Sequence, residues 1–260
     1  MGSSLSVTEL ITQLFAPFRA DPIGSAVFTD FDGTLAPIVD DPASARPLPG
    51  AVDVLGALAG RYGRVGVISG RPAAFLRTHL GGRGLFLSGL YGLELAPGDG
   101  EIHTLPAAEA WREVVDEVAA RAEAALAPGL SVERKGLSVT VHYRGDPARA
   151  EAAAAWAENE GAATGLVVHP ARMSYELRPP GERDKGAVLL EAVEGRRQAC
   201  FLGDDRGDLP AFDALDRLAA AGTTVAKVGV ASPEAPDELL ARADVVVDGP
   251  EGALRVLRAL

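Results

Sequence analysis

The chain has 260 residues, of which 25 are basic and 36 acidic, so its formal net charge is −11. This balance argues against a general nucleic-acid surface, because neutralising a row of phosphates requires a basic stripe. A small phosphorylated ligand stays compatible with it, since such a ligand needs only a local positive pocket. No apolar run approaches the roughly 18–20 residues of a membrane span and no secretory signal is recognisable, so we expect a cytoplasmic protein without a membrane partner.

The first hundred residues alternate between helical and strand-like patterns. The predicted order is helix, strand, loop, helix, strand and hairpin over residues 5–19, 25–32, 40–50, 51–61, 64–70 and 84–96. The opening helix is amphipathic, with apolar side chains at helical spacing. The strands over 25–32 and 64–70 are continuously apolar, which is typical of parallel sheets covered by helices on both faces.

After about residue 105 the pattern changes. A helix over 107–126 precedes two strands joined at Lys135-Gly136, and a helix over 147–160 precedes a second strand pair. This repeated α-β-β unit predicts a separate small α+β module. From residue 184 the earlier alternation returns. We therefore predict a doubly wound, mostly parallel, Rossmann-like α/β core formed by residues 1–104 and 179–260, with residues 105–178 inserted as the second domain.

Polar side chains stand at the predicted carboxyl ends of several core strands. Asp30 and Asp32 follow the first strand and Ser69 ends the second. The segment "GDDRGD" over 203–208 follows a later strand, and Lys185 begins the helix before it. Ligands of open parallel sheets bind beyond these strand ends, so we expect the four signals to converge on one site.

Such a set of residues suits phosphoryl transfer. Carboxylates that converge on one edge repel each other unless a cation lies among them, and all-oxygen ligation favours Mg²⁺ before Ca²⁺. Lys185 and the Ser69 hydroxyl would bind the anionic oxygens of a phosphoryl group. One aspartate can then be the nucleophile and another the general acid and base.

Each of these signals also has a purely structural explanation. Asp32 before Gly33 is a common turn residue, Ser69 could cap a helix, and Lys185 could be a solvated helix charge. The acidic residues over 204–208 could be a helix cap and first-turn residues that interact favourably with the helix dipole. Their order along the chain, each at a strand or helix end, favours a shared site.

The motifs carry a family resemblance. "DFDGTL", the strand end "ISG", the isolated Lys185 and "GDDRGD" together resemble the four motifs of the haloacid dehalogenase superfamily of phosphohydrolases. The resemblance implies that Asp30 attacks phosphorus, while Asp32 protonates the leaving oxygen and then activates water. It further implies that Ser69 and Lys185 hold the phosphate. The implied Mg²⁺ ligands are the Asp30 carboxylate, the Asp32 carbonyl and Asp204, with Asp208 supporting directly or through water.

Nearly the whole chain is similar to the trehalose-6-phosphate phosphatases. The matching segments are "DFDGTLAPI", "VISGR", "YGLEL", "VERKGLSVTVHYR", "YELRP" with "DKG", and "GDDRGD". In that family the insertion is a cap that closes over the disaccharide. The resemblance implies substrate contacts from Glu133, Lys135 and Glu176 in the cap, and from Gly70 and Arg71 beside the phosphate.

Three positions depart from that family's pattern. Gly207 and Leu209 stand where the family commonly has Thr and Glu, and Tyr91 stands where His often precedes "GLE". The metal-binding aspartates are intact, so the departures concern the sugar fit and the surroundings of the metal site.

We therefore expect a Mg²⁺-dependent phosphatase that hydrolyses trehalose 6-phosphate through an aspartyl-phosphate. The same chemistry on another phosphorylated disaccharide or pseudo-disaccharide, such as sucrose phosphate or a glycosyl phosphoglycerate, stays open, as does a non-catalytic sugar-phosphate sensor. The expected partner is a small phosphorylated sugar. The oligomeric state is open, with a monomer as the expectation.

Overall fold

The computed structural model describes residues 6–39, 41–82, 84–171, 173–181, 183–232 and 235–260. These residues form two compact units. Met1–His103 and Arg183–Leu260 make up the first, called the core unit below, and Thr104–Glu182 make up the second, the inserted unit. The insertion predicted over 105–178 overlaps the second unit, whose role as a cap stays a prediction. Leu5 of the predicted first helix and Asp40 of the predicted loop lie outside the described residues.

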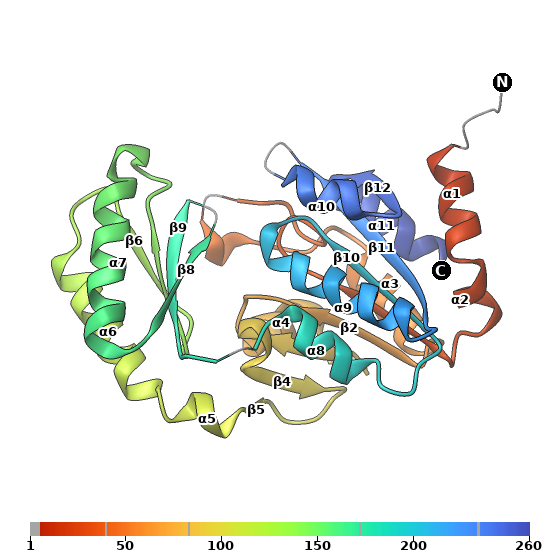
Figure 1. Ribbon diagram of the computed structural model, residues 1–260, viewed down its shortest axis with the longest axis horizontal. Helices are drawn as coiled ribbons and strands as arrows, with labels where there is room; N and C mark the ends of the chain where they lie inside the picture. Colours follow the sequence, from red (N-terminus) through yellow and green to blue (C-terminus); the bar gives the residue numbers. More distant parts are fainter. Residues whose placement is uncertain (1–5, 40, 83, 172, 182, 233–234) are drawn as a thin grey trace. The chain divides into compact units, whose positions relative to one another are not determined.

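Within the described residues, the large sheet has eight strands in the order β12-β11-β10-β1-β2-β3-β4-β5 (Figure 1). The strands are β1 (Ser25–Thr29), β2 (Arg64–Ile68), β3 (Phe86–Gly89), β4 (Glu94–Pro97), β5 (His103–Thr104), β10 (Gln198–Gly203), β11 (Thr224–Ala231) and β12 (Val245–Asp248). The pairs from β12 to β3 are parallel, and β3 and β4 form the predicted antiparallel hairpin. The predicted α/β fold with a mostly parallel sheet is confirmed.

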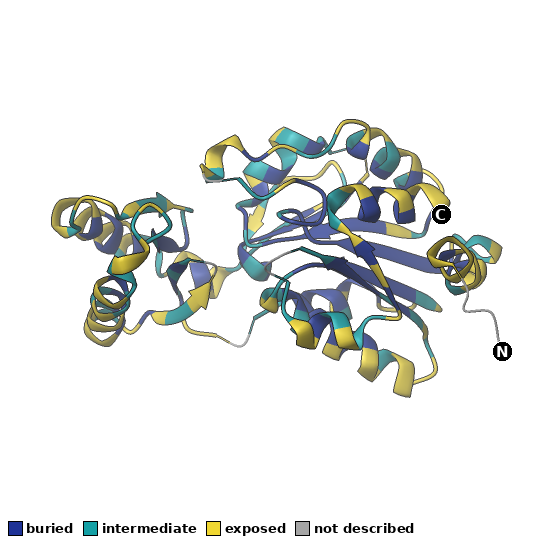
Figure 2. Cartoon of the chain, turned by 90° about the horizontal axis from the view of Figure 1, so that it is seen from above, coloured by how far each residue is buried: buried dark blue, intermediate teal, exposed yellow. Residues whose placement is uncertain are grey.

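Helices cover both faces of this sheet. Successive strand residues point to opposite faces, so Phe28 packs with residues of α8, α9 and α10, and Val27 packs with residues of α1 to α4 and α11. Figure 2 shows the strands buried between helices whose outer sides are exposed. The helices are α1 (Val7–Leu14), α2 (Ala16–Ala20), α3 (Ala51–Ala59), α4 (Ala73–Leu80), α8 (Lys185–Ala192), α9 (Leu209–Ala220), α10 (Asp237–Arg242) and α11 (Gly249–Ala259). Short 3-10 turns are η1 (Pro42–Ser44), η2 (Leu90–Gly92) and η4 (Arg206–Asp208).

The prediction of one continuous helix over 5–19 was wrong. The helix ends after Leu14, and α2 begins at Ala16 with Pro17 in its first turn. Proline has no backbone N–H, so it cannot continue the hydrogen-bond ladder of α1 but is well placed at a helix start. The buried rings of Phe15 and Phe18 lie 5.2 Å apart at this corner and anchor both helices to the core.

The inserted unit is an α+β module. Its antiparallel sheet has the order β6-β7-β9-β8. The strands are β6 (Ser131–Arg134), β7 (Val139–His142), β8 (Val167–Ala171) and β9 (Ser174–Arg178), and the helical segments are α5 (Pro106–Glu109), α6 (Arg112–Ala125), η3 (Pro147–Arg149) and α7 (Ala150–Thr164). Val139 and Leu177 pack with residues of α6 and α7 to form the unit's own apolar core. The prediction of one continuous helix over 107–126 was wrong, because Ala110 and Trp111 form a turn between α5 and α6.

No helix in the described part of the chain is both long and apolar enough to cross a membrane.

Candidate active site

The core sheet brings three of the predicted site residues to one edge. Asp30 follows β1, Ser69 follows β2 and Asp204 follows β10, and these three strands are neighbours in the order β10-β1-β2. The Asp30 amide donates to Leu202 O at 2.9 Å, which extends the β1–β10 pairing by one step. The Ser69 amide donates to Ser88 O at 2.9 Å on the other side. The position of the site at the strand ends follows from this parallel topology.

Lys185 lies buried between two carboxylates. Its Nζ is 2.8 Å from Asp30 Oδ1 and 2.6 Å from Asp208 Oδ1. The side chain reaches them from the first turn of α8, which Asp184 caps by accepting a hydrogen bond from the Ala187 amide. Burial by itself lowers the pKa of Lys185, but the carboxylates of Asp208 and Asp30 outweigh it and hold the pKa well above its usual value. The lysine is therefore positively charged.

Three buried carboxylates converge beside this lysine. Asp30, Asp204 and Asp208 each offer an oxygen, and the three oxygens lie within 4.8 Å of one another. Asp208 Oδ2 accepts hydrogen bonds from the Asp204 and Asp205 amides, which fixes it in the turn after β10. Burial raises the pKa of Asp30 and Asp204 well above the usual value, and raises that of Asp208 to about 6 even though Lys185 opposes the shift.

The charges of this cluster do not balance, because three carboxylates face one ammonium group. Buried like charges raise one another's pKa, and an added cation reverses the effect. An all-oxygen donor set is the kind that hard divalent cations prefer. The residues therefore fit a divalent metal ion, with Asp30, Asp204 and Asp208 as its carboxylate ligands.

The cluster predicts a stabilising effect of metal that depends on pH. Since the pKa of Asp208 is raised to about 6 in the folded protein, its contribution to stability is present below the ordinary value near 4 and is lost as pH rises through about 6. A divalent cation offsets that loss. Added Mg²⁺ should thus raise the melting temperature of EDTA-treated protein by several degrees at about pH 7.5 and by clearly less at about pH 5. Thermal melts followed by circular dichroism test this, and equal shifts at both pH values would contradict it.

Asp32 lies outside the carboxylate cluster and is held by Arg71. The guanidinium donates through Nε to Asp32 Oδ2 and through Nη2 to Asp32 Oδ1, both at 2.7 Å. Arg71 is itself fixed by the Pro42 carbonyl, which accepts from Nη1 at 2.8 Å, and by the Phe75 ring at 4.7 Å. A bidentate pair of this kind sets both the position and the plane of the carboxylate. The family resemblance implies that Arg71 lies beside the phosphate, which stays a prediction, and the structure pairs its guanidinium with Asp32.

The turn after Asp32 is shaped to admit Asp204. Gly33 has φ +81°, and a Cβ at this position would lie 2.0 Å from Asp204 Oδ2. Only glycine combines that backbone angle with so close an approach. Thr34 then donates its hydroxyl hydrogen bond to Asp204 Oδ1 at 2.9 Å. We did not predict a role for Thr34, whose only sequence signal is its place directly after "DFDG".

Ser69, Gly70 and Tyr91 form the side of the site that follows β2. Ser69 is buried, and its Oγ accepts a hydrogen bond from the Arg71 amide at 3.2 Å. The Tyr91 amide donates to Ser69 O at 3.0 Å, so the η2 turn is attached to this strand end. Gly70 faces the Tyr91 side chain.

The three predicted residues of the inserted unit also come together. Lys135 Nζ lies 3.4 Å from Glu176 Oε1 and 3.8 Å from Glu133 Oε2. Ser138 donates to Glu176 Oε1 at 2.7 Å, and His142 Nε2 lies 2.9 Å from Glu133 Oε2. Glu133, Thr140 and Glu176 are direct neighbours across β6, β7 and β9, so they share one face of the sheet. The alternation of His142 with apolar neighbours indicates a hydrogen-bonded strand residue, as the structure has it, whereas a role for Ser138 was not predicted.

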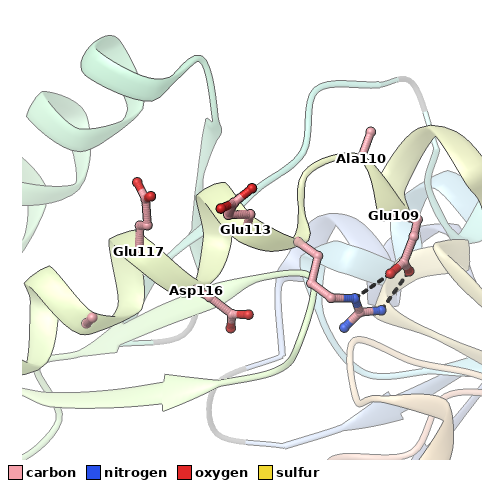
Figure 3. Close-up of a pocket in the computed structure, with 7 residues that line it drawn as sticks. Glu109, Ala110, Glu113, Asp116 and Glu117 are labelled. Atoms are coloured by element: carbon pink, nitrogen blue, oxygen red, sulfur yellow. Dashed lines mark hydrogen bonds and ion pairs between the residues drawn. The ribbon is translucent and has the colours of Figure 1, made fainter.

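A surface hollow of about 610 Å³ in the inserted unit contains none of the predicted site residues. Figure 3 shows the acidic side chains of Glu109, Glu113, Asp116 and Glu117 along it. Arg112 also lines it, but Glu109 holds that guanidinium through two hydrogen bonds. So acidic a lining repels phosphate esters, and the hollow is not a phosphate site.

This chain is similar in sequence to a known protein family and to several curated proteins. The family model described as Trehalose-phosphatase matches residues 28–240. The Trehalose-phosphate phosphatase of Mycobacterium leprae is 37% identical over 214 residues, which cover 77% of this chain and 50% of that protein. The protein of the same name from Mycobacterium avium is 40% identical over 200 residues, covering 73% and 51%. The chain thus spans about half the length of the curated relatives it matches.

The fold has a counterpart among solved structures. The C-terminal domain of the Candida albicans trehalose-6-phosphate phosphatase superposes with a TM-score of 0.77 over 98% of this chain and 96% of that one, at 24% identity. Both units of the chain therefore have the fold found there.

Proposed function

The chain belongs to the trehalose-phosphatase family, and from this we propose that it hydrolyses trehalose 6-phosphate to trehalose and inorganic phosphate. The position of Asp30 gives this proposal its strongest support. This carboxylate stands at the end of β1, is buried, contacts the Lys185 ammonium at 2.8 Å and belongs to a cluster that fits a divalent ion. On this proposal, a nucleophile, a phosphate-binding cation and a metal site would converge on one residue.

Asp30 would act as the nucleophile. Its Oδ attacks phosphorus, the bond from phosphorus to the sugar oxygen breaks, and an aspartyl-phosphate forms on Asp30. Water then attacks the phosphorus of that intermediate, and the bond to Asp30 breaks to release phosphate. Asp30 begins and ends the cycle as a carboxylate.

Asp32 would transfer the protons. In the first step Asp32, protonated on an oxygen that has left the Arg71 guanidinium, would donate this proton to the departing sugar oxygen, and in the second step the Asp32 carboxylate would take a proton from the attacking water. Its bidentate pairing with Arg71 holds the carboxyl group in a fixed plane. A pure sugar-phosphate sensor has no need of a second carboxyl group held in this way, which favours an enzyme over a sensor.

The remaining core residues would neutralise charge. Lys185, the Ser69 hydroxyl and the Gly70 amide would bind the phosphoryl oxygens. We propose Mg²⁺ as the metal, held by the carboxylates of Asp30, Asp204 and Asp208 and by the Asp32 carbonyl. When bound, the ion supplies positive charge that lets the phosphoryl group approach a carboxylate.

The inserted unit would recognise the sugar. Glu133, Lys135 and Glu176 form a cluster of acceptors and one donor on a single sheet face, which suits the hydroxyl groups of a disaccharide. We propose that this unit acts as a cap and that these three residues contact the sugar. Exclusion of water by such a cap would protect the aspartyl-phosphate.

Phosphate release from a panel of sugar phosphates tests the function. We expect kcat/KM for trehalose 6-phosphate to exceed that for sucrose 6-phosphate and glucose 6-phosphate by about tenfold or more. EDTA should abolish the activity, and excess Mg²⁺ should restore it. A higher kcat/KM for another sugar phosphate would show that trehalose 6-phosphate is not the preferred substrate. Full activity in EDTA would contradict the proposed metal requirement. No phosphate release from any sugar phosphate of the panel would favour a non-catalytic sensor.

A further inference from the structure

Tyr91 has a backbone conformation that a tyrosine rarely adopts. Its φ and ψ are 56° and 29°, and the preceding Leu90 has φ 50°. Side chains other than glycine are disfavoured in this left-handed region, and two in succession are uncommon. Such residues persist where the surroundings hold them, and they are frequent at ligand sites.

The surroundings that hold Tyr91 belong to the predicted phosphate site. The Tyr91 amide donates to Ser69 O at 3.0 Å, and the Leu90 amide donates to Arg71 O at 3.0 Å. The η2 turn is thus attached on both sides of Gly70 to the strand end that follows β2. This attachment orients the Tyr91 side chain relative to Ser69 and Gly70.

The phenol lies between the loops that carry the site. A Cβ built on Gly70 would be 2.6 Å from the Tyr91 hydroxyl oxygen, so this hydroxyl lies directly over the Gly70 backbone. A Cβ on Gly207 would be 3.6 Å from Tyr91 Cε1, which places the ring beside the turn after β10. Tyr91 is also close enough to Lys185 to act on its pKa. The Tyr91 residue as a whole is partly exposed.

Resting on the proposed phosphatase function, we propose that Tyr91 is a phosphate-binding residue whose hydroxyl donates a hydrogen bond to an oxygen of the phosphoryl group beside Gly70 and Lys185. A phenol is neutral at physiological pH and can donate without adding negative charge. That property matters at this site, because three carboxylates already lie there. The hydroxyl would add a donor on the side of the phosphoryl group that faces η2.

The ring could instead serve only as a spacer that fills the room over Gly207. The two roles separate in the Tyr91→Phe variant, which keeps the ring and removes the hydroxyl. If the ring is only a spacer, this substitution leaves the affinity for a phosphoryl group unchanged. If the hydroxyl donates to that charged group, the hydrogen bond is lost, and its loss weakens binding of the phosphoryl group by about 10- to 100-fold.

The test uses orthovanadate, a mimic of the transferring phosphoryl group, with the full chain in excess Mg²⁺. Calorimetric titration should give a dissociation constant about 10- to 100-fold higher for Tyr91→Phe than for the unmodified protein. The affinity for Mg²⁺ alone should be unchanged. Tyr62→Phe is the matched control, because the Tyr62 hydroxyl donates to Leu260 O within the same unit and lies outside the site. Its affinity for orthovanadate should equal that of the unmodified protein.

A second measurement, by NMR, detects binding of orthovanadate at Tyr91 in the unmodified protein. The chain has 4 tyrosines, and with the Cζ atoms labelled by ¹³C the Tyr91 resonance is the one missing from Tyr91→Phe. That resonance should move on addition of orthovanadate to the unmodified protein. A Tyr91→Phe affinity within twofold of the unmodified protein, or an unmoved resonance in saturated protein, would overturn the role of Tyr91. Failure of the unmodified protein both to bind orthovanadate and to release phosphate would instead overturn the proposed function, and this inference with it.

Discussion

Replacement of Asp30 by asparagine is expected to lower kcat for phosphate release by about 10⁴-fold or more. The amide has nearly the same size as the carboxylate but is not a nucleophile towards phosphorus, so no aspartyl-phosphate can form. The loss should appear for every substrate that the unmodified protein turns over, because all of them share this step. Steady-state phosphate release with each active sugar phosphate measures it.

The matched control is Asp213→Asn. Asp213 is an exposed residue of α9 that pairs with Arg242 at 2.6 Å, outside the carboxylate cluster. The same change of aspartate to asparagine there should leave kcat within about twofold, since exposed ion pairs contribute little. Thermal melts of both variants exclude unfolding as the cause. Turnover of Asp30→Asn near that of the control would show that Asp30 is not the nucleophile.

Replacement of Lys185 by methionine is expected to lower the free energy of unfolding by about 3–5 kcal/mol in the absence of metal. The ammonium group is buried between Asp30 and Asp208, and its removal leaves buried carboxylates without their cation. Because these carboxyl groups have raised pKa values, they can become protonated in mild acid, and the destabilisation should be smaller at about pH 5 than at about pH 7.5. Urea denaturation in EDTA at the two pH values measures both effects.

The variant should also lose phosphatase activity, since it lacks the proposed cation for the phosphoryl oxygens. Lys227→Met is the control, because Lys227 pairs with the exposed Asp216 at 2.7 Å away from the cluster. We expect it to cost about 1 kcal/mol or less and to retain activity. If Lys185→Met unfolds at the same urea concentration as Lys227→Met at both pH values, Lys185 does not offset the buried carboxylates.

Local patterns in the amino-acid sequence were sufficient to predict most of the fold. Continuous apolar runs predicted β1 and β2, and the glycine-rich alternation predicted the β3–β4 hairpin. The strand and helix order predicted a mostly parallel sheet with an α+β insertion. The prediction failed at Phe15, where the first helix is divided in two. The cause is Pro17, whose effect on the backbone hydrogen bonds is not apparent from the spacing of apolar residues.

The candidate site was predictable for a related reason. In a parallel sheet all strands end at the same edge, so residues that directly follow strands meet there regardless of their distance in sequence. That rule accounts for Asp30, Ser69 and Asp204. For Glu133, Lys135 and Glu176, the family resemblance supplied the expectation, and pairing of β6, β7 and β9 brings them onto one face.

The residue types at the strand ends, and with them the expected chemistry, are readable from the amino-acid sequence. Which of these residues pair depends on the tertiary structure. It holds Asp32 through Arg71, 39 positions away, joins Thr34 to Asp204 across 170 positions, and places the Tyr91 phenol over Gly70. Periodicity and propensity describe the chain over a few neighbouring residues. Partners separated by tens to hundreds of residues meet only after loops and strand order are set, and those contacts position each carboxylate.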